Sequence, residues 1–365
     1  MTPQTLTAER RLPAEIDTIA ELEAYLNAAL RLEHATIPPY LTALYSLHPG
    51  ANSDARHLIR VVAVEEMLHL TLVANVMNAL GFRVDLTADD FVPRYPAHLP
   101  SGEIDFLVSV GPFSQAAVTT FLNIERPAKA PNESSRLLPR PDLGAGTVLA
   151  ASPLDPSRRF YSIGEFYEEI DRGLRHLHRE QGDRLFSGDI TRQVGPEYFY
   201  SGGGEVVVVH DLASALRALE LITEQGEGLG GGIYDGEGEL SHYYRYQQLQ
   251  LGHYYQKGDV PGRPSGPPLD MDFAAVYPVA IDAALSDYPD GSPVLEAAQR
   301  FQQTYADFLG FLTAAYDGAP QKLLDAVPWM FRLRDDIEHL IRNPFPGRPG
   351  VHASPVFTRA PEDRS

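Results

Sequence analysis

The sequence predicts a mainly α-helical fold: a four-helix bundle with additional C-terminal helices and a small mixed α/β insertion. Three observations support this prediction. Apolar residues recur at spacings of three and four over several long stretches, which is the period of an amphipathic helix. The connection between the first two of these stretches is short, so the two helices should pack antiparallel. Segments rich in proline and glycine separate the later stretches and predict loops between them.

Two long helices are expected in the N-terminal part. The first helical pattern extends from Ile16 to Leu47 and contains the pair Pro38 and Pro39. Because proline has no backbone N–H and its ring crowds the preceding turn, this pair predicts a kink or a break. The second helix is expected over residues 54–80. Gly81 follows it in the position that a helix-ending glycine usually takes.

The segment 82–210 is interpreted as an insertion of mixed character. Turn residues surround a strand-like run at 104–110, and a run of valines predicts a second strand at 205–210. Helices are expected at 114–124 and 162–185. The stretch 127–156 is rich in Pro, Ser, Gly and Ala, which predicts an irregular loop that is long enough to cover a site as a lid.

The remaining helices follow after residue 210. They are expected at 211–226 and 239–256, and near the C-terminus at 293–316 and 320–342. We therefore expect a single domain over residues 1–365, with core helices at about 17–80 and 211–256, an insertion at about 82–210 and C-terminal helices at about 293–343.

Composition excludes several classes of function. The 365 residues include 30 Lys and Arg against 49 Asp and Glu, a formal net charge of −19, so we expect no nucleic acid and no membrane as partners. The chain has no cysteine, which excludes thiolate metal sites and thiol nucleophiles. It shows no signal peptide and no membrane-length apolar run, which predicts a soluble cytoplasmic protein. A homo-oligomer is left open.

Two Glu-x-x-His motifs supply the candidate metal-ligating residues of the sequence. They are Glu66 with His69 and Glu239 with His242, a spacing that places carboxylate and imidazole on one face of a helix. Glu66 and His69 complete the apolar stripe of their helix, and Glu33 completes the stripe of the first helix. Burying a carboxylate without a partner costs several kcal/mol. Several inward carboxylates therefore indicate a bound cation, although either motif taken alone is more simply explained as a surface pair.

Helical bundles can hold two metal ions with one Glu from each of two helices and a Glu-x-x-His from each of the other two. The third carboxylate should come from the helix before Glu239, and its last turn favours Glu227. The expected ligands are Glu33, Glu66, His69, Glu227, Glu239 and His242, with Glu224 as the alternative to Glu227. Oxygen and imidazole ligands without thiolates suit a dinuclear iron site, with manganese or zinc as alternatives.

Four stretches around these residues resemble a known family. They are Leu30–Leu41, Val64–His69, Ile222–Gly228 and Glu239–Tyr246, within a similarity that extends from about Leu22 to the segment at Pro344. They resemble the ferritin-like domain family of iminophenyl-pyruvate dimer synthase, the violacein-pathway type. The resemblance implies a ferritin-like four-helix bundle, a bound metal pair and the oxidative coupling of imines derived from aromatic amino acids.

These features together predict a non-haem diiron oxidase or oxygenase that acts with dioxygen on a small aromatic substrate derived from an amino acid. Tyr40 and Tyr246 lie near the expected ligands and are candidates for a catalytic role, with simple core packing as the alternative. No dinucleotide cofactor is expected, because the glycine pattern that begins at Gly226 follows a helix instead of a strand. The alternative functions are metal storage without turnover and a scaffold in a biosynthetic complex.

Overall fold

The computed structural model describes residues 16–101, 106–128, 160–200 and 202–359. Helices dominate these residues, and no β-sheet forms among them beyond isolated bridges. The α-helices are α1 (Ile19–Ser46), α2 (Ser53–Ala79), α3 (Gln115–Ile124), α4 (Ile163–Gln181), α5 (Leu212–Glu227), α6 (His242–Leu251), α7 (Pro293–Tyr316) and α8 (Lys322–Ile341).

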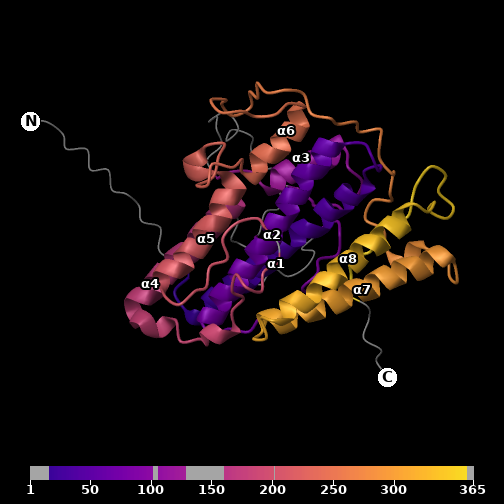
Figure 1. Cartoon of the computed structure of the whole chain (residues 1–365). Coiled ribbons are helices and arrows are strands. Elements are labelled where there is room, and N and C mark those ends of the chain that lie inside the picture. Colours follow the sequence, from indigo (N-terminus) through magenta and orange to yellow (C-terminus); the bar gives the residue numbers. More distant parts are fainter. Residues whose placement is uncertain (1–15, 102–105, 129–159, 201, 360–365) are drawn as a thin grey trace, which may run out of the picture.

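The helices are arranged in pairs around α1 and α2, which pack along their length at the centre (Figure 1). The pair α4 and α5 covers one side of this central pair, and the hairpin of α7 and α8 covers the other. The short helices α3 and α6 pack on each other and on the upper end of α1 and α2 in the view of Figure 1. Most buried apolar side chains of these helices belong to one continuous core.

The expected break at Pro38 and Pro39 does not occur, because α1 continues through both prolines as one helix. Pro39 cannot donate to the carbonyl of Ala35 one turn earlier, which leaves that buried carbonyl without its helical partner. The hydroxyl of Tyr95 donates to the Ala35 oxygen at 2.8 Å. A side chain from outside the helix thus replaces the hydrogen bond that Pro39 removes.

The mixed α/β insertion expected at 82–210 is not seen, because its described residues form helices and no strand. The run 205–210 is extended but pairs with no strand. The side-chain amide of Gln193 both donates to and accepts from the backbone of Val209, and Asn75 on α2 donates to the carbonyl of Val207. Because these amides supply hydrogen bonds that a neighbouring strand would otherwise give, the valines enter the helical core without a sheet.

The other expectations for the insertion have mixed outcomes. Of the run 104–110, the described part makes a single bridge, between Val108 and Ala97. The lid expected at 127–156 lies almost entirely outside the described residues. The helices expected at 114–124 and 162–185 are confirmed as α3 and α4, and both contribute buried side chains to the main core.

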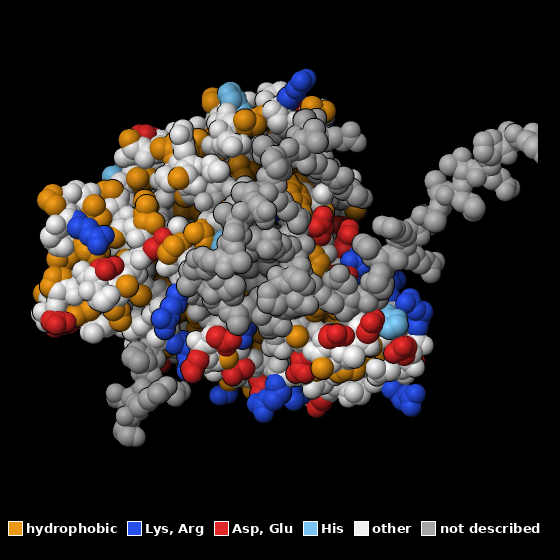
Figure 2. All heavy atoms as spheres, turned by 180° about the vertical axis from the view of Figure 1, so that it is seen from behind, with side chains coloured by type: hydrophobic (Ala, Val, Ile, Leu, Met, Phe, Trp, Pro, Cys, Tyr) orange, Lys and Arg blue, Asp and Glu red, His pale blue; other side chains and the backbone are white. Residues whose placement is uncertain are grey.

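On the outside, acidic and basic side chains are interspersed along the lower edge of the face that Figure 2 shows. On α4, for example, Arg175 pairs with Asp171. None of the helices in the described ranges is long and apolar enough to cross a membrane.

The role of Tyr95 can be tested by replacement with Phe, which leaves the Ala35 carbonyl without a partner. Leaving a buried polar group unsatisfied costs about 1–3 kcal/mol. We expect Tyr95→Phe to lower the free energy of unfolding by about 1–2 kcal/mol in denaturant titrations. Tyr200→Phe is the matched control, because Tyr200 is 66% exposed. Equal stability of the two variants would contradict this role.

Candidate metal centre

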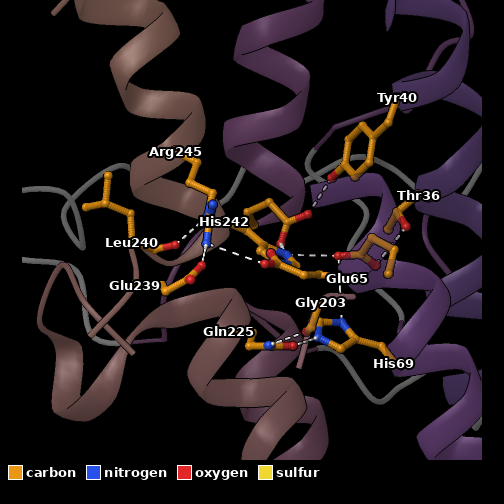
Figure 3. Close-up of polar contacts among 12 residues, drawn as sticks. Thr36, Tyr40, Glu65, His69, Gly203, Gln225, Glu239, Leu240, His242 and Arg245 are labelled. Carbon is orange, nitrogen blue, oxygen red and sulfur yellow. Dashed lines mark hydrogen bonds and ion pairs between the residues drawn. The ribbon is translucent and has the colours of Figure 1, made fainter. Parts of the chain in front are cut away.

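A group of buried carboxylates and imidazoles lies where α1, α2, α3 and α6 meet (Figure 3). Glu33 comes from α1, and Glu66 and His69 come from adjacent turns of α2. Glu125 directly follows the last residue of α3, and His242 is the first residue of α6. All five side chains are at most 4% exposed. The helices therefore bring three carboxylates and two imidazoles together in the buried core.

The hydrogen bonds of His242 define where its lone pair points. Its Nε2 lies 2.8 Å from the Glu65 carboxylate, which can only accept when ionised, so Nε2 carries the proton. The other ring nitrogen, Nδ1, then faces Glu66 Oε1 at 2.9 Å and Glu125 Oε2 at 3.4 Å. This Nδ1 has no aligned hydrogen-bond partner among the described residues. A lone pair facing two acceptors requires a cation between them, either an extra proton or a metal ion.

His69 has the same orientation through a different partner. The Gln225 amide donates from Nε2 to the carbonyl of Gly203 at 2.7 Å, so its Oε1 must be the atom that faces His69 Nε2 at 2.9 Å. His69 therefore donates from Nε2 and presents Nδ1 to Glu33 Oε2 at 3.3 Å and to Glu66 Oε1 at 3.8 Å. Both histidines thus aim Nδ1 at the carboxylates, and Glu66 lies between them.

Hydroxyl groups orient the three carboxylates. Thr36 donates to Glu66 Oε2 at 2.9 Å. Tyr40 donates to Glu125 Oε1 and Tyr167 to Glu33 Oε1. In each carboxylate one oxygen is held by a hydroxyl, and the other faces a histidine Nδ1.

The distances suit metal coordination. Two ligand atoms that bind one ion at about 2.0–2.2 Å and are separated by about 90–110° lie roughly 2.8–3.6 Å apart. The four N···O distances from the two Nδ1 atoms extend from 2.9 to 3.8 Å. Ligand atoms of Glu66, His69 and His242 all lie within 4.8 Å of one another. A small cavity of about 20 Å³ adjoins the group. The residues present therefore fit a metal ion.

The pKa values of Glu66 and His242 also reflect the several charged groups that lie close together here. Burial and then the nearby Glu125 raise the pKa of Glu66 to about 7. Burial alone would lower the pKa of His242, but Glu125, Glu65 and Glu66 outweigh it and raise that pKa well above its usual value. Without a metal ion, protons on these groups supply the positive charge that the carboxylates require.

Three carboxylates expected from the sequence as ligands or alternatives are placed differently. Glu239 precedes α6 instead of lying within it, so the helical spacing to His242 does not apply. Its side chain is 61% exposed and contacts Arg245 at 2.7 Å. The Glu224 side chain is partly exposed, and its carboxylate lies against Gly236.

Glu227 lies on the wall of the adjoining cavity, but its oxygens are occupied. Oε1 accepts from the backbone N–H of Gly164 at 2.8 Å, and Oε2 accepts from that of Ala128 at 2.9 Å. The Glu227 carboxylate approaches α4 so closely that a Cβ atom at Gly164 would lie 2.2 Å from Oε1 of Glu227. Glu227 therefore caps the first turn of α4 with a negative charge.

Glu125 was missed by the sequence analysis although a signal for it exists. Val118, Phe121 and Leu122 form the buried stripe of α3, and Glu125 continues this stripe at the next helical spacing. The same stripe argument that identifies Glu33 and Glu66 applies here. The helix at 114–124 belongs to the segment interpreted as an insertion, so Glu125 is not among the ligands expected from the sequence.

The two tyrosine candidates lie beside the group. Tyr40 holds Glu125, and its ring packs against Tyr246 at a centroid distance of 5.2 Å. Burial, together with the Glu125 charge, raises the pKa of both tyrosines well above the usual value. Both hydroxyls therefore stay protonated at neutral pH. Tyr40 acts in this arrangement as a hydrogen-bond donor to a carboxylate of the group.

A ferritin-like family model matches residues 26–251, which is more than half of the chain and includes all five residues of the group. The chain belongs to the ferritin-like family. A solved ferritin-like protein from Caulobacter vibrioides has the same fold, with a TM-score of 0.63 and 24% identity over 93% of this chain and 98% of that one.

Two curated relatives are similar over much of this chain but over a small part of their own length. The 2-imino-3-(indol-3-yl)propanoate dimerase of Chromobacterium violaceum is 25% identical over 65% of this chain and 24% of its own length. The dichlorochromopyrrolate synthase of Lentzea aerocolonigenes is 26% identical over 81% of this chain and 29% of its own length. The chain thus spans roughly a quarter of the length of these two relatives.

Metal analysis can separate the carboxylates of the group from those outside it. We expect Glu125→Ala to lower the bound iron or manganese per chain after reconstitution, because the variant removes an oxygen that faces His242 Nδ1. Glu224→Ala is the matched control and should keep the wild-type metal content, measured by atomic emission. Loss of metal in Glu224→Ala with retention in Glu125→Ala would reverse the assignment.

Proposed function

We propose that this ferritin-like protein holds two metal ions through Glu33, Glu66, His69, Glu125 and His242. His69 with Glu33 would hold one ion, and His242 with Glu125 the other. Glu66 would bridge them, because its Oε1 faces both rings, at 2.9 Å from His242 Nδ1 and 3.8 Å from His69 Nδ1. The observation that supports this proposal most directly is the pair of buried Nδ1 atoms aimed at carboxylate oxygens. Each requires a cation in that position.

We propose iron as the metal. Three carboxylate ligands carry three negative charges, which two divalent ions offset within one unit of charge. Ligands of oxygen and imidazole without thiolate suit iron, with manganese next. Two iron ions bound here would supply the binding and reduction of dioxygen. The protein contributes the fixed orientation of the ligands and a core from which bulk water is excluded.

The proposed reaction is the oxidative coupling of imines derived from aromatic amino acids. The names of the two curated relatives, a 2-imino-3-(indol-3-yl)propanoate dimerase and a dichlorochromopyrrolate synthase, support this substrate class. Joining two such molecules forms one carbon–carbon bond, breaks two C–H bonds and releases two electrons and two protons. Dioxygen can accept these as hydrogen peroxide.

Arg126 supports a substrate that carries a carboxylate. It lines the cavity beside the group, together with Glu33, Glu66, Glu125 and Glu227. Its guanidinium lies 4.3 Å from the centre of the Tyr161 ring and 5.3 Å from that of Phe106. A guanidinium group that packs against aromatic rings is suited to bind the carboxylate of a substrate and to stack on its aromatic ring.

Oxygen consumption of the iron-loaded protein tests the function. We expect indole-3-pyruvate with ammonium, which form the imine in solution, to cause sustained oxygen uptake and a coupled dimer detectable by mass spectrometry. Glu66→Ala should lose iron and uptake, and His242→Ala should lose one of the two iron ions together with the uptake. A single uptake that ends when the bound iron is oxidised, with no effect of the imine, would instead support metal storage. Retention of uptake by both variants would refute the site.

A further inference from the structure

The two histidines of the group are held from outside by partners of different charge (Figure 3). His242 Nε2 donates to the carboxylate of Glu65 at 2.8 Å, whereas His69 Nε2 donates to the neutral amide of Gln225 at 2.9 Å. Glu65 and Gln225 are both buried, at 4% and 6% exposure. Water therefore weakens this difference little, because the local dielectric constant is low.

The charge of Glu65 is only partly balanced. Arg245 Nη2 approaches Glu65 Oε1 at 3.4 Å but lies closer to Glu239 Oε2, at 2.7 Å. Arg245 also donates from Nε to the carbonyl of Leu240 at 2.5 Å. The chain of Glu65, Arg245 and Glu239 carries a net charge of −1, so His242 retains an anionic partner.

The segment at Gly203 and Gly204 packs against both partners. The carbonyl of Gly203 fixes the Gln225 amide, and a Cβ at Gly203 would lie 3.3 Å from Cγ of Glu65. A Cβ at Gly204 would lie 2.8 Å from Nε2 of Gln225. Both glycines have positive φ, +102° and +128°, which other residues rarely adopt. One backbone segment thus holds the two partners in place.

We propose that Glu65 and Gln225 make the two metal positions unequal. An imidazole that donates to a carboxylate becomes a stronger donor to a metal than one that donates to a neutral amide. The position at His242 therefore binds a divalent ion more tightly than the position at His69 and favours its higher oxidation state. This inference rests on the pair of metal positions in the proposed function, and Glu65 and Gln225 are positioning residues.

Variants that keep only one of the two site histidines, His69 or His242, allow the two metal positions to be measured separately. His69→Ala leaves only the position at His242, and His242→Ala leaves only the position at His69. Anaerobic titration with Co²⁺, followed through its visible absorption, gives a Kd for each. We expect a lower Kd in His69→Ala. A lower Kd in His242→Ala, or equal values, would overturn the proposal.

Substitutions of the two partners then test the cause. In the His69→Ala background, Glu65→Gln should raise the Kd about 10–100-fold, which is the usual effect of losing an outer partner. In the His242→Ala background, Gln225→Glu should lower the Kd about tenfold or more. Both changes are nearly isosteric, and circular dichroism and thermal melting check that the fold is kept.

The crossed combinations are the matched controls. Glu65→Gln in the His242→Ala background should leave the Kd unchanged within about threefold, because the histidine that Glu65 supports is absent. An equal loss of affinity in both backgrounds would mean that the negative charge of Glu65 acts on both metal positions alike and not through His242. That result would overturn the inference. Glu65→Asp keeps the charge but shortens the side chain, so in the His69→Ala background we expect it to weaken binding as Gln does. Wild-type affinity in Glu65→Asp would also overturn it.

A spectroscopic measurement on the chain with both histidines completes the test. With ⁵⁷Fe²⁺ bound, we expect two distinct Mössbauer doublets, which should converge in Gln225→Glu because both histidines then have anionic partners. Two doublets that stay unchanged in this variant would contradict the inference. These readings need no substrate, so a protein with unequal positions but no oxygen uptake would refute the proposed reaction and leave the inequality standing.

Discussion

Two buried imidazole nitrogens that face carboxylate oxygens set the central constraint of this protein. The Nδ1 atoms of His69 and His242 and the oxygens of Glu33, Glu66 and Glu125 are all acceptors, and they approach one another to within 2.9–3.8 Å. Without a cation among them this arrangement would be repulsive in a medium of low dielectric constant. Hydrogen bonds to surrounding side chains keep the group in this geometry. They come from the hydroxyls of Thr36, Tyr40 and Tyr167, the amide of Gln225 and the carboxylate of Glu65.

The fold meets this constraint with helices of two kinds. Glu33, Glu66 and His69 lie inside the long helices α1 and α2, where several turns on either side are packed into the core. Glu125 and His242 lie at the ends of the short helices α3 and α6, so their positions depend on how these helices pack against the central pair. The two histidines have unequal partners in this arrangement, because Glu65, which supports His242, lies on α2, whereas Gln225, which supports His69, lies on α5.

Prediction from the sequence succeeded where a residue lies within a long, regular helix. There the direction of a side chain follows from its position in the repeat, which is why Glu33, Glu66 and His69 were placed in the core correctly. It failed at Glu239, because α6 begins three residues later, at His242, and a spacing has no directional meaning outside a helix. It also failed at residues 205–210, where side-chain amides take the place of a neighbouring strand.

The sequence by itself determined the helical class, the ferritin-like family and the three members of the group that lie on α1 and α2, because periodicity and motif spacing are local properties of the chain. Tertiary structure alone decided that Glu125 lies against His242, that Glu227 caps α4 and that Glu65 and Gln225 support the two histidines. These contacts join residues from 63 to 177 positions apart. No local pattern encodes such pairings, since they depend on which helix faces which in the packed core.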